Sequence, residues 1–322
     1  MFYSRNKICM IIPYFGRFPE WFNVYLYSCS KVNIDFYFFT DCKLPSKIYK
    51  NTHFTKLSYK QYCQIVSEKL NLNFQPDNRY NLVKIRPFIG LIHHDICSKY
   101  LFWGYSDIDL IYGNINQYLT DQILSKYNLI TTHSTRVAGH FTIIKTKSKY
   151  TTICLDIPNW KEKLETEKII AVDESDFTKV VNPALKYMNA IYFRIFRRFL
   201  SDKWSSAPKL FQYMQSIYRF FTHYDCLFNE CFTSPIPTKE QVWQYDTTSN
   251  KILTPKTYPK SNIVYLHFIF FKKTDYLRTN YEWKKGFYKI PRNFGFNRGK
   301  WVDISYRGIQ LHGENKRKIN DC

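Results

Sequence analysis

The sequence has few glycines, few acidic residues for its size and no long apolar run. No stretch approaches the roughly 18 consecutive apolar residues of a membrane-spanning helix. Only 10 glycines occur in 322 residues, which excludes collagen-like and glycine-rich linker chains. The apolar run at residues 8–12 follows Arg5 and Lys7 as in a signal peptide, but Pro13 ends it without a small-residue cleavage site. We therefore expect a cytoplasmic protein.

Metal-binding cysteine patterns are also missing. The chain has nine cysteines, an odd number, and no Cys-x-x-Cys pair. The closest pair, Cys226 and Cys231, has no paired histidines nearby to complete a zinc site. These features are typical of buried free thiols in a reducing compartment.

Apolar and aromatic residues are abundant. Hydrophobic residues make up 45% of the chain and aromatic residues 19%, which excludes intrinsic disorder. The length favours one core of about 200–250 residues with an appendage. Lys and Arg number 47 against 26 Asp and Glu, and the net charge of +21 suits partners that carry phosphate or lie on an anionic surface.

The first half alternates between two kinds of pattern. Short apolar runs predict strands at residues 7–12, 33–40, 100–104, 128–132 and 140–145. Helical spacing predicts helices at residues 19–31, 59–70, 86–100 and 115–127. This alternation favours an α/β fold with a mainly parallel central sheet flanked by helices. Ligands of such sheets bind beyond the carboxyl ends of the strands.

Three regions are expected along the chain: residues 1–180 as an α/β core, 181–235 as an insertion, and 236–322 as a part that completes the core. The insertion carries seven basic residues and one acid between residues 183 and 221, with apolar residues at helical spacing. This basic, aromatic helical hairpin packs on its own domain with its arginines solvated, or lies on an anionic membrane surface. The last region holds an expected strand at residues 262–271 and a basic tail.

The most informative stretch runs from Tyr100 to Asn114, where an apolar strand leads into Asp107 and Asp109. On an extended segment, residues two apart point to the same side, so the two carboxylates can converge on one cation. Two carboxylates together with substrate phosphate oxygens commonly hold Mg²⁺ or Mn²⁺. The alternative is a solvated turn in which one acid caps the next helix.

The block Phe102–Ile115 resembles glycosyltransferases of the GT-A type, in particular small bacterial enzymes of capsule and lipopolysaccharide assembly. The resemblance covers roughly residues 5–180 and 240–275. Further matching elements follow in the same order: Ile11–Gly16, Phe39–Asp41, Arg86-Pro87, Gly139–Thr142, Val172–Glu174 and Tyr265–Phe268. The resemblance implies a GT-A-like fold and a metal-dependent transfer of a sugar from a nucleotide-sugar.

It also implies a metal centre. Asp107, Asp109 and His267 would bind the Mn²⁺ or Mg²⁺ ion that bridges the diphosphate of a UDP- or GDP-sugar. Lys272 and Lys273 would neutralise the phosphates. Related enzymes carry a glycine between the histidine and the lysine, and residues 267–273 of this chain have none.

The resemblance assigns the donor nucleotide to the first loop and the second strand end. Pro13, Tyr14 and Phe15 would face the nucleotide, and Asp41 would bond the base or ribose. Tyr14 and Phe15 are equally plausible as core aromatics. Arg86 opens a helix near the strand ends and would reach a phosphate; the alternative is a surface salt bridge.

Three residues are candidates for catalysis. His140 follows Gly139, where bare backbone allows close approach to a sugar, and the alternative is a strand histidine beside the core. Asp173 and Glu174 would place a carboxylate near the reacting carbon, as a general base in an inverting enzyme or near the cationic centre in a retaining one. The alternative is an acidic pair that complements a helix N-terminus.

The expected function is transfer of a sugar to a glycan or lipid-linked acceptor in surface polysaccharide synthesis. Peripheral contact with an anionic membrane would present such an acceptor. One rival is a nucleic-acid-binding protein, which the net charge favours, but no zinc finger, RRM signature or homeodomain-like element occurs. The other is a metal-dependent phosphodiesterase, which usually needs more acids and histidines around two metals.

Overall fold

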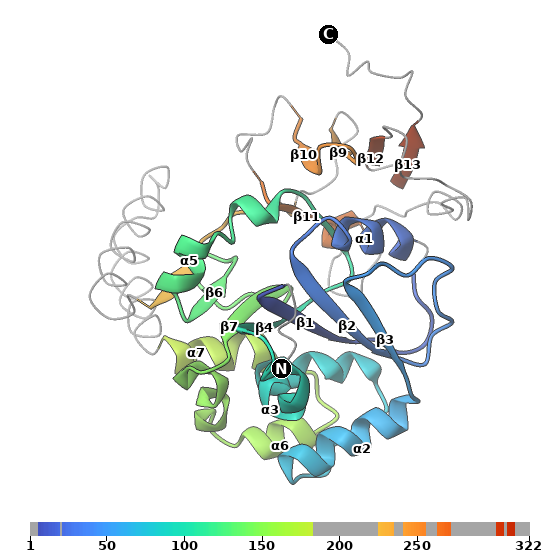
Figure 1. Ribbon diagram of the computed structural model, residues 1–322. Coiled ribbons are helices and arrows are strands. Elements are labelled where there is room, and N and C mark those ends of the chain that lie inside the picture. Colours follow the sequence, from blue (N-terminus) through green and yellow to red (C-terminus); the bar gives the residue numbers. More distant parts are fainter. Residues whose placement is uncertain are drawn as a thin grey trace, which may run out of the picture. The chain divides into compact units, whose positions relative to one another are not determined.

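The computed structural model describes residues 6–19, 21–182, 225–234, 241–255, 263–271, 301–305 and 308–312 (Figure 1). The chain forms two compact units, each built from separated segments. Unit 1 comprises Met1–Pro13, Leu57–Ser106 and Asp121–Glu230. Unit 2 comprises Tyr14–Lys56, Asp107–Thr120 and Cys231–Cys322.

Unit 1 contains five strands of the central sheet. They lie in the order β1 (Ile8–Pro13), β4 (Phe102–Ser106), β7 (Phe141–Lys145), β6 (Leu129–Thr131) and β8 (Cys226–Phe228). Strand β1 runs parallel to β4, and β6 runs parallel to β8, whereas β7 is antiparallel to both of its neighbours. Every residue of β4 is buried, as expected of an interior strand covered on both faces.

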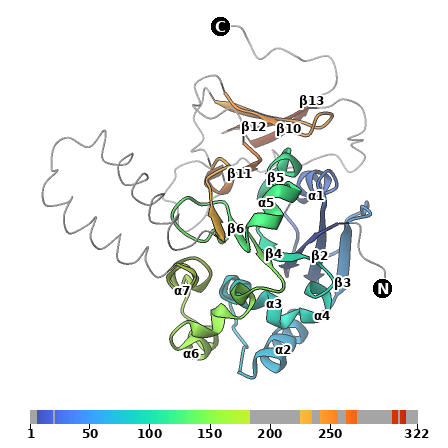
Figure 2. The same cartoon turned by 60° about the vertical axis from the view of Figure 1, so that its left-hand side comes forward.

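Helices cover the sheet of unit 1. Helix α2 (Tyr59–Leu70) is capped by Ser58: its side chain accepts a hydrogen bond from the Gln61 backbone amide, and the Gln61 side chain accepts one from the Ser58 backbone amide. The helix ends at Asn71, which has the left-handed conformation. Figures 1 and 2 both show α2, α3 and α6 near one another, and α3 contacts β4. The other helical elements of unit 1 are η1 (Arg79–Phe88), α3 (Ile89–Ile92), α4 (His94–Cys97), α5 (Asp121–Lys126), η3 (Lys149–Thr151), η4 (Ile153–Asp156), α6 (Trp160–Glu165), η5 (Val172–Asp176) and α7 (Phe177–Val181).

Unit 2 contains three groups of strands and the helix α1 (Phe22–Cys29). Strands β2 (Ile34–Thr40) and β3 (Thr52–Lys56) are parallel. Strands β5 (Leu110–Tyr112) and β11 (Tyr265–His267) are antiparallel, and the turns η2 (Ile115–Gln117) and η6 (Ile269–Phe271) follow them in the chain. A four-stranded antiparallel sheet has the order β10 (Lys251–Leu253), β9 (Val242–Asp246), β12 (Trp301–Ser305) and β13 (Gly308–His312).

One apolar cluster holds unit 2 together. The inward face of the four-stranded sheet supplies Trp243, Tyr245, Val302 and Ile304, which are all fully buried. These side chains pack in one cluster with residues of α1, β5 and β11. Burying large apolar side chains of this kind contributes about 1.5–3 kcal/mol each, so the short strands are stabilised mainly by their shared core. Among its members, Ile111 and Leu266 belong to the two strands that carry the candidate site.

The α/β class is confirmed, and the ladders of β1–β4, β2–β3 and β6–β8 make the strand pairing of the central elements mostly parallel. The helix expected at residues 59–70 is confirmed. The continuous helices expected at 86–100 and 115–127 are wrong: Pro87 lies in the 3₁₀ helix η1, and residues 118–120 separate η2 from α5. The strand expected at 262–271 is reduced to β11, since the chain turns into η6 after His267.

Several expectations fall on residues outside the described ranges. The basic hairpin at residues 183–221 and most of the basic tail are among them, so the division into core, insertion and tail stays a prediction. Buried free thiols were expected, and in the described part of the chain eight cysteines are free thiols and seven of these are buried. Within the same residues, none of the helices has the length and apolar character that spanning a bilayer requires.

Candidate functional site

The pairing of two short strands in unit 2 creates the candidate metal centre. Asp109 directly precedes β5, and His267 is the last residue of β11. Because the strands are antiparallel, the start of β5 faces the end of β11, and His267 is opposite Leu110. One residue further on, the Phe268 amide donates to the Asp109 carbonyl at 3.1 Å. The ladder therefore brings the imidazole next to the Asp109 carboxylate.

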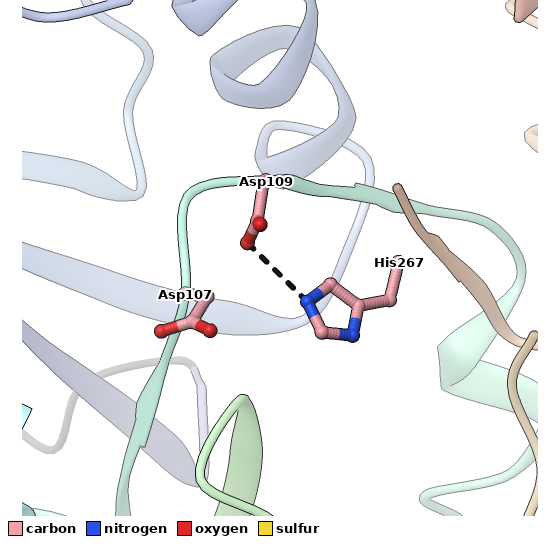
Figure 3. Close-up of side chains that lie close together, drawn as sticks. All are labelled: Asp107, Asp109 and His267. Atoms are coloured by element: carbon pink, nitrogen blue, oxygen red, sulfur yellow. Dashed lines mark ion pairs between the residues drawn. The ribbon is translucent and has the colours of Figure 1, made fainter. Parts of the chain in front are cut away.

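Asp107, Asp109 and His267 form a compact triad. One potential ligand atom from each residue lies within 4.8 Å of the others. His267 Nε2 is 3.5 Å from Asp109 Oδ1, which is longer than an ordinary hydrogen bond. Figure 3 shows both carboxylates and the imidazole turned toward the same space. The predicted convergence of Asp107 and Asp109 is present, and the histidine joins them.

The triad fits a divalent cation in its chemistry and spacing. Oxygen ligands bind Mg²⁺ at about 2.0–2.1 Å, so two neighbouring ligands of one ion lie about 3 Å apart. The observed 3.5 Å separation needs only a small contraction to meet that value. Asp109 and His267 are buried and Asp107 is half-buried. The three residues could therefore hold a metal ion at a site that keeps contact with solvent on the Asp107 side.

Ser234 contacts the far side of the imidazole. Its Oγ lies 3.1 Å from His267 Nδ1, so the two ring nitrogens have different neighbours. Residues 231–233 run beside β11, and the amide of His267 donates to the Thr233 carbonyl at 2.8 Å. Sequence analysis missed Ser234, and a single serine before Pro235 carries no signal that would have revealed it.

The loop after β1 is organised by Asp41. The Gly16 amide donates to Asp41 Oδ1 at 2.6 Å, and Gly16 has a φ of 106°, which favours glycine. Lys56 Nζ donates to the carbonyls of Asp41 and Cys42, both at 2.7 Å. The Asp41 carboxylate thus fixes the conformation of the 14–16 loop within unit 2.

Tyr14 and Phe15 differ in their surroundings. Phe15 is buried, which agrees with the core alternative for that residue. Tyr14 is half-buried, and its ring stacks on Phe18 at a centroid distance of 5.5 Å. Burial, with smaller contributions from the charges of Cys42 and Asp109, raises the pKa of Tyr14 to about 12. Tyr14 is therefore a neutral phenol at pH 7 in the field of the triad.

Unit 1 brings together a second group of predicted residues. Arg86 Nη1 donates to Asp173 Oδ2 at 2.8 Å, and their side chains are 17% and 6% exposed. The guanidinium is therefore engaged in an ion pair that is mostly buried, whereas the alternative for Arg86 was a salt bridge at the surface. Asp173 and Glu174 lie in the π-helical turn η5, a rare element that is frequent at functional sites.

Gly139 sits against all three of these charged groups. Its amide donates to Glu174 Oε1 at 3.1 Å. A Cβ at Gly139 would be 2.6 Å from Asp173 Oδ2, 3.0 Å from Arg86 Nη1 and 3.1 Å from Glu174 Oε1. Only glycine fits this position without a shift. The groups that approach Gly139 are the acid pair and Arg86, whereas the close approach of a sugar stays a prediction.

The two acids differ in their exposure to solvent. Asp173 is 4% exposed, whereas the Glu174 side chain is 33% exposed. Arg136 Nε lies 3.3 Å from Glu174 Oε2 and its side chain is 49% exposed. Arg136 was not predicted, although its position three residues before Gly139 was a usable signal. Of the two predicted carboxylates, Glu174 is the one that is accessible to solvent.

His140 lies at the entry to β7 and is buried. Its ring meets His133 edge-on, with the centroids 5.3 Å apart.

The remaining predicted residues divide as follows. Tyr14, Phe15 and Asp41 lie in unit 2 with the triad, Pro13 ends β1 in unit 1, and Lys272 and Lys273 lie outside the described residues.

Comparison with protein families gives a match over most of the chain. A family model described as a family of unknown function, DUF6625, matches residues 10–297. The chain belongs to this family. The matched region contains the triad and the residues Arg86, Gly139, Asp173 and Glu174 of unit 1. No curated protein matches the chain.

Proposed function

We propose that the chain is a metal-dependent glycosyltransferase. It transfers a sugar from a nucleotide-sugar to a glycan or lipid-linked acceptor in surface polysaccharide synthesis. The observation that carries the proposal is the Asp107, Asp109 and His267 triad on the β5–β11 pair. The resemblance of residues 102–115 to GT-A enzymes and the α/β fold support it.

The ligand atoms of the triad favour a small divalent ion that also binds phosphate. Two carboxylates and one imidazole suit Mn²⁺ better than Ca²⁺, which takes more oxygen ligands. Three protein ligands leave further coordination positions open for diphosphate oxygens. Such an ion, when bound, supplies Lewis-acid stabilisation to the leaving nucleoside diphosphate.

The protein's own groups complete the donor site in unit 2. Asp107 and Asp109 supply two negative charges, which would repel a diphosphate unless a cation lies between them. Tyr14 is a neutral phenol at pH 7, as tyrosine ordinarily is, so its hydroxyl can donate a hydrogen bond to a ribose or phosphate oxygen. Asp41 holds the loop that carries Tyr14.

The acid pair of unit 1 is a separate part of the proposal, and it rests on the resemblance. Asp173 is held by Arg86 and therefore acts as a positioning group for η5. Glu174 is fixed by the Gly139 amide and Arg136, with one third of its side chain exposed. Glu174 is therefore the carboxylate to test for a role in catalysis.

Donor hydrolysis tests the proposal most simply. A set of UDP- and GDP-sugars is incubated with the full chain and Mn²⁺, and release of free sugar and nucleoside diphosphate is followed. We expect one donor to be hydrolysed, with turnover lost on chelation and lowered about 100-fold or more in Asp107→Asn and Asp109→Asn.

The matched control is Asp121→Asn, an aspartate whose side chain is 81% exposed and pairs with Lys7. It should retain full turnover. Full activity in both triad variants would refute the metal assignment. Cleavage of a phosphodiester substrate without release of sugar from any donor would favour the phosphodiesterase instead.

A further inference from the structure

The backbone around β11 places Ser234 beside His267. Strand β11 has β5 on one side and residues 231–233 on the other, where Thr233 pairs in parallel with Leu266. The Val264 amide donates to the Cys231 carbonyl and the His267 amide to the Thr233 carbonyl, both at 2.8 Å. Ser234 is the next residue, so its position relative to the imidazole is set by main-chain hydrogen bonds.

The hydroxyl of Ser234 meets one ring nitrogen and leaves the other to the aspartates. Ser234 Oγ lies 3.1 Å from His267 Nδ1, whereas His267 Nε2 lies 3.5 Å from Asp109 Oδ1. A neutral imidazole has one N–H and one lone pair, and only the lone pair can bind a metal. A serine oxygen can accept the Nδ1–H, and the lone pair on Nε2 then points at Asp109.

Phe232 is an apolar neighbour of the ring and cannot make this choice. The Phe232 ring stacks on Tyr265 at 5.1 Å and lies 6.4 Å from the imidazole. His267 is 5% exposed, so bulk water does not readily replace the hydroxyl. Hydrogen bonds to the second nitrogen commonly fix the orientation and tautomer of metal-binding histidines.

We propose that Ser234 is a positioning residue of the metal centre, which selects the tautomer that presents His267 Nε2 to the ion. The inference rests on the metal site of the proposed function. The inference predicts weaker binding of those metal ions for which the His267 imidazole is an important ligand. Loss of the hydroxyl should weaken Mn²⁺ binding about 10-fold or more, in the range known for such outer contacts. Mg²⁺ relies mainly on carboxylates and should be affected less than twofold.

The test measures metal binding directly, without a sugar donor. Mn²⁺ is titrated into the full chain and the free ion is followed by electron paramagnetic resonance, and Mg²⁺ affinity is obtained by competition. The variants are Ser234→Ala and the isosteric pair Ser234→Thr and Ser234→Val, of which only threonine keeps a hydroxyl. Ser249→Ala is the control, since that hydroxyl bonds Asp246 in the same unit away from the triad.

The inference would be supported if Ser234→Thr binds Mn²⁺ with an affinity within about twofold of wild type while Ser234→Val and Ser234→Ala bind it more weakly. The isosteric pair decides the question if the alanine variant does not fold. Wild-type Mn²⁺ affinity in alanine and valine, with a loss in His267→Ala, would overturn the role of Ser234 and leave the metal centre intact. Failure of the wild-type chain to bind Mn²⁺ would overturn the metal centre and this inference together.

Discussion

Removing the positive charge of Arg86 should destabilise the protein by about 3 kcal/mol. Arg86 and Asp173 are 2.8 Å apart, and the Asp173 side chain is only 6% exposed. Their attraction at an effective dielectric constant near 20 is about 6 kcal/mol, and desolvation offsets part of it. Deleting one partner of a buried pair leaves the other charge unpaired, which usually costs about 3–5 kcal/mol. The partial exposure of Arg86 favours the lower end of that range.

A double-mutant cycle measures this interaction. Arg86→Met, Asp173→Asn and the double variant are unfolded with urea at pH 7, and the free energies of unfolding are compared. The double variant should lose about 2 kcal/mol less than the sum of the single losses, because the two residues share one interaction.

The control is Lys7→Met. Lys7 and Asp121 are closer, at 2.6 Å, but their side chains are 51% and 81% exposed, so the loss should stay within about 0.5 kcal/mol. An Arg86→Met variant as stable as wild type, or additive effects in the cycle, would refute the structural role. Arg86 would then be available for the phosphate contact that the sequence resemblance implies.

Three further predictions concern unit 1. Burial lowers the pKa of His93 to about 4, so the unfolded chain binds more protons than the folded chain between pH 6.5 and 4. The free energy of unfolding should therefore fall with decreasing pH in this range, by up to about 1.4 kcal/mol per pH unit. His93→Gln should flatten that slope in urea titrations, and an unchanged slope would contradict the assignment. Gly139→Ala should lower stability by about 1–3 kcal/mol, since its Cβ would be 2.6 Å from Asp173 Oδ2, and a neutral effect in thermal unfolding would argue against the packing. Glu174→Gln should reduce donor turnover about 100-fold while changing the unfolding temperature little, and equal turnover would exclude Glu174 from catalysis.

The elements with strong local signals were predictable from the sequence. Strand β1 is a continuous apolar run, and α2 combines helical spacing with Ser58 and Gln61 at its start. Asp107 and Asp109 were also predictable, because a two-residue spacing after a buried strand has one geometric consequence. These features depend on contacts within a few residues of one another.

Elements that depend on distant partners were missed or drawn too long. The four-stranded sheet of unit 2 was not predicted, although Trp243 and Tyr245 alternate with polar residues, as do Val302 and Ile304. Strands of three to five residues give too few repeats for a period to stand out. Their stability comes from the shared cluster rather than from local preference.

The contacts inside the candidate sites show the same limit. The resemblance pointed to His267, but neither Ser234 nor the β5–β11 pairing that aligns it with Asp109 has a sequence signal. In unit 1 the sequence identified Arg86 and Asp173 separately. Their pairing joins segments far apart in the chain, and it changes the expected role of Arg86 from a phosphate ligand to a partner of Asp173.

Binding of Mn²⁺ to the purified full chain is the most direct test of the central claim. Calorimetric titration of wild type should give one site, and its affinity should fall about 100-fold or more in Asp109→Asn and His267→Ala, with Asp121→Asn unchanged. Absence of saturable binding, or binding that survives both triad substitutions, would contradict the account.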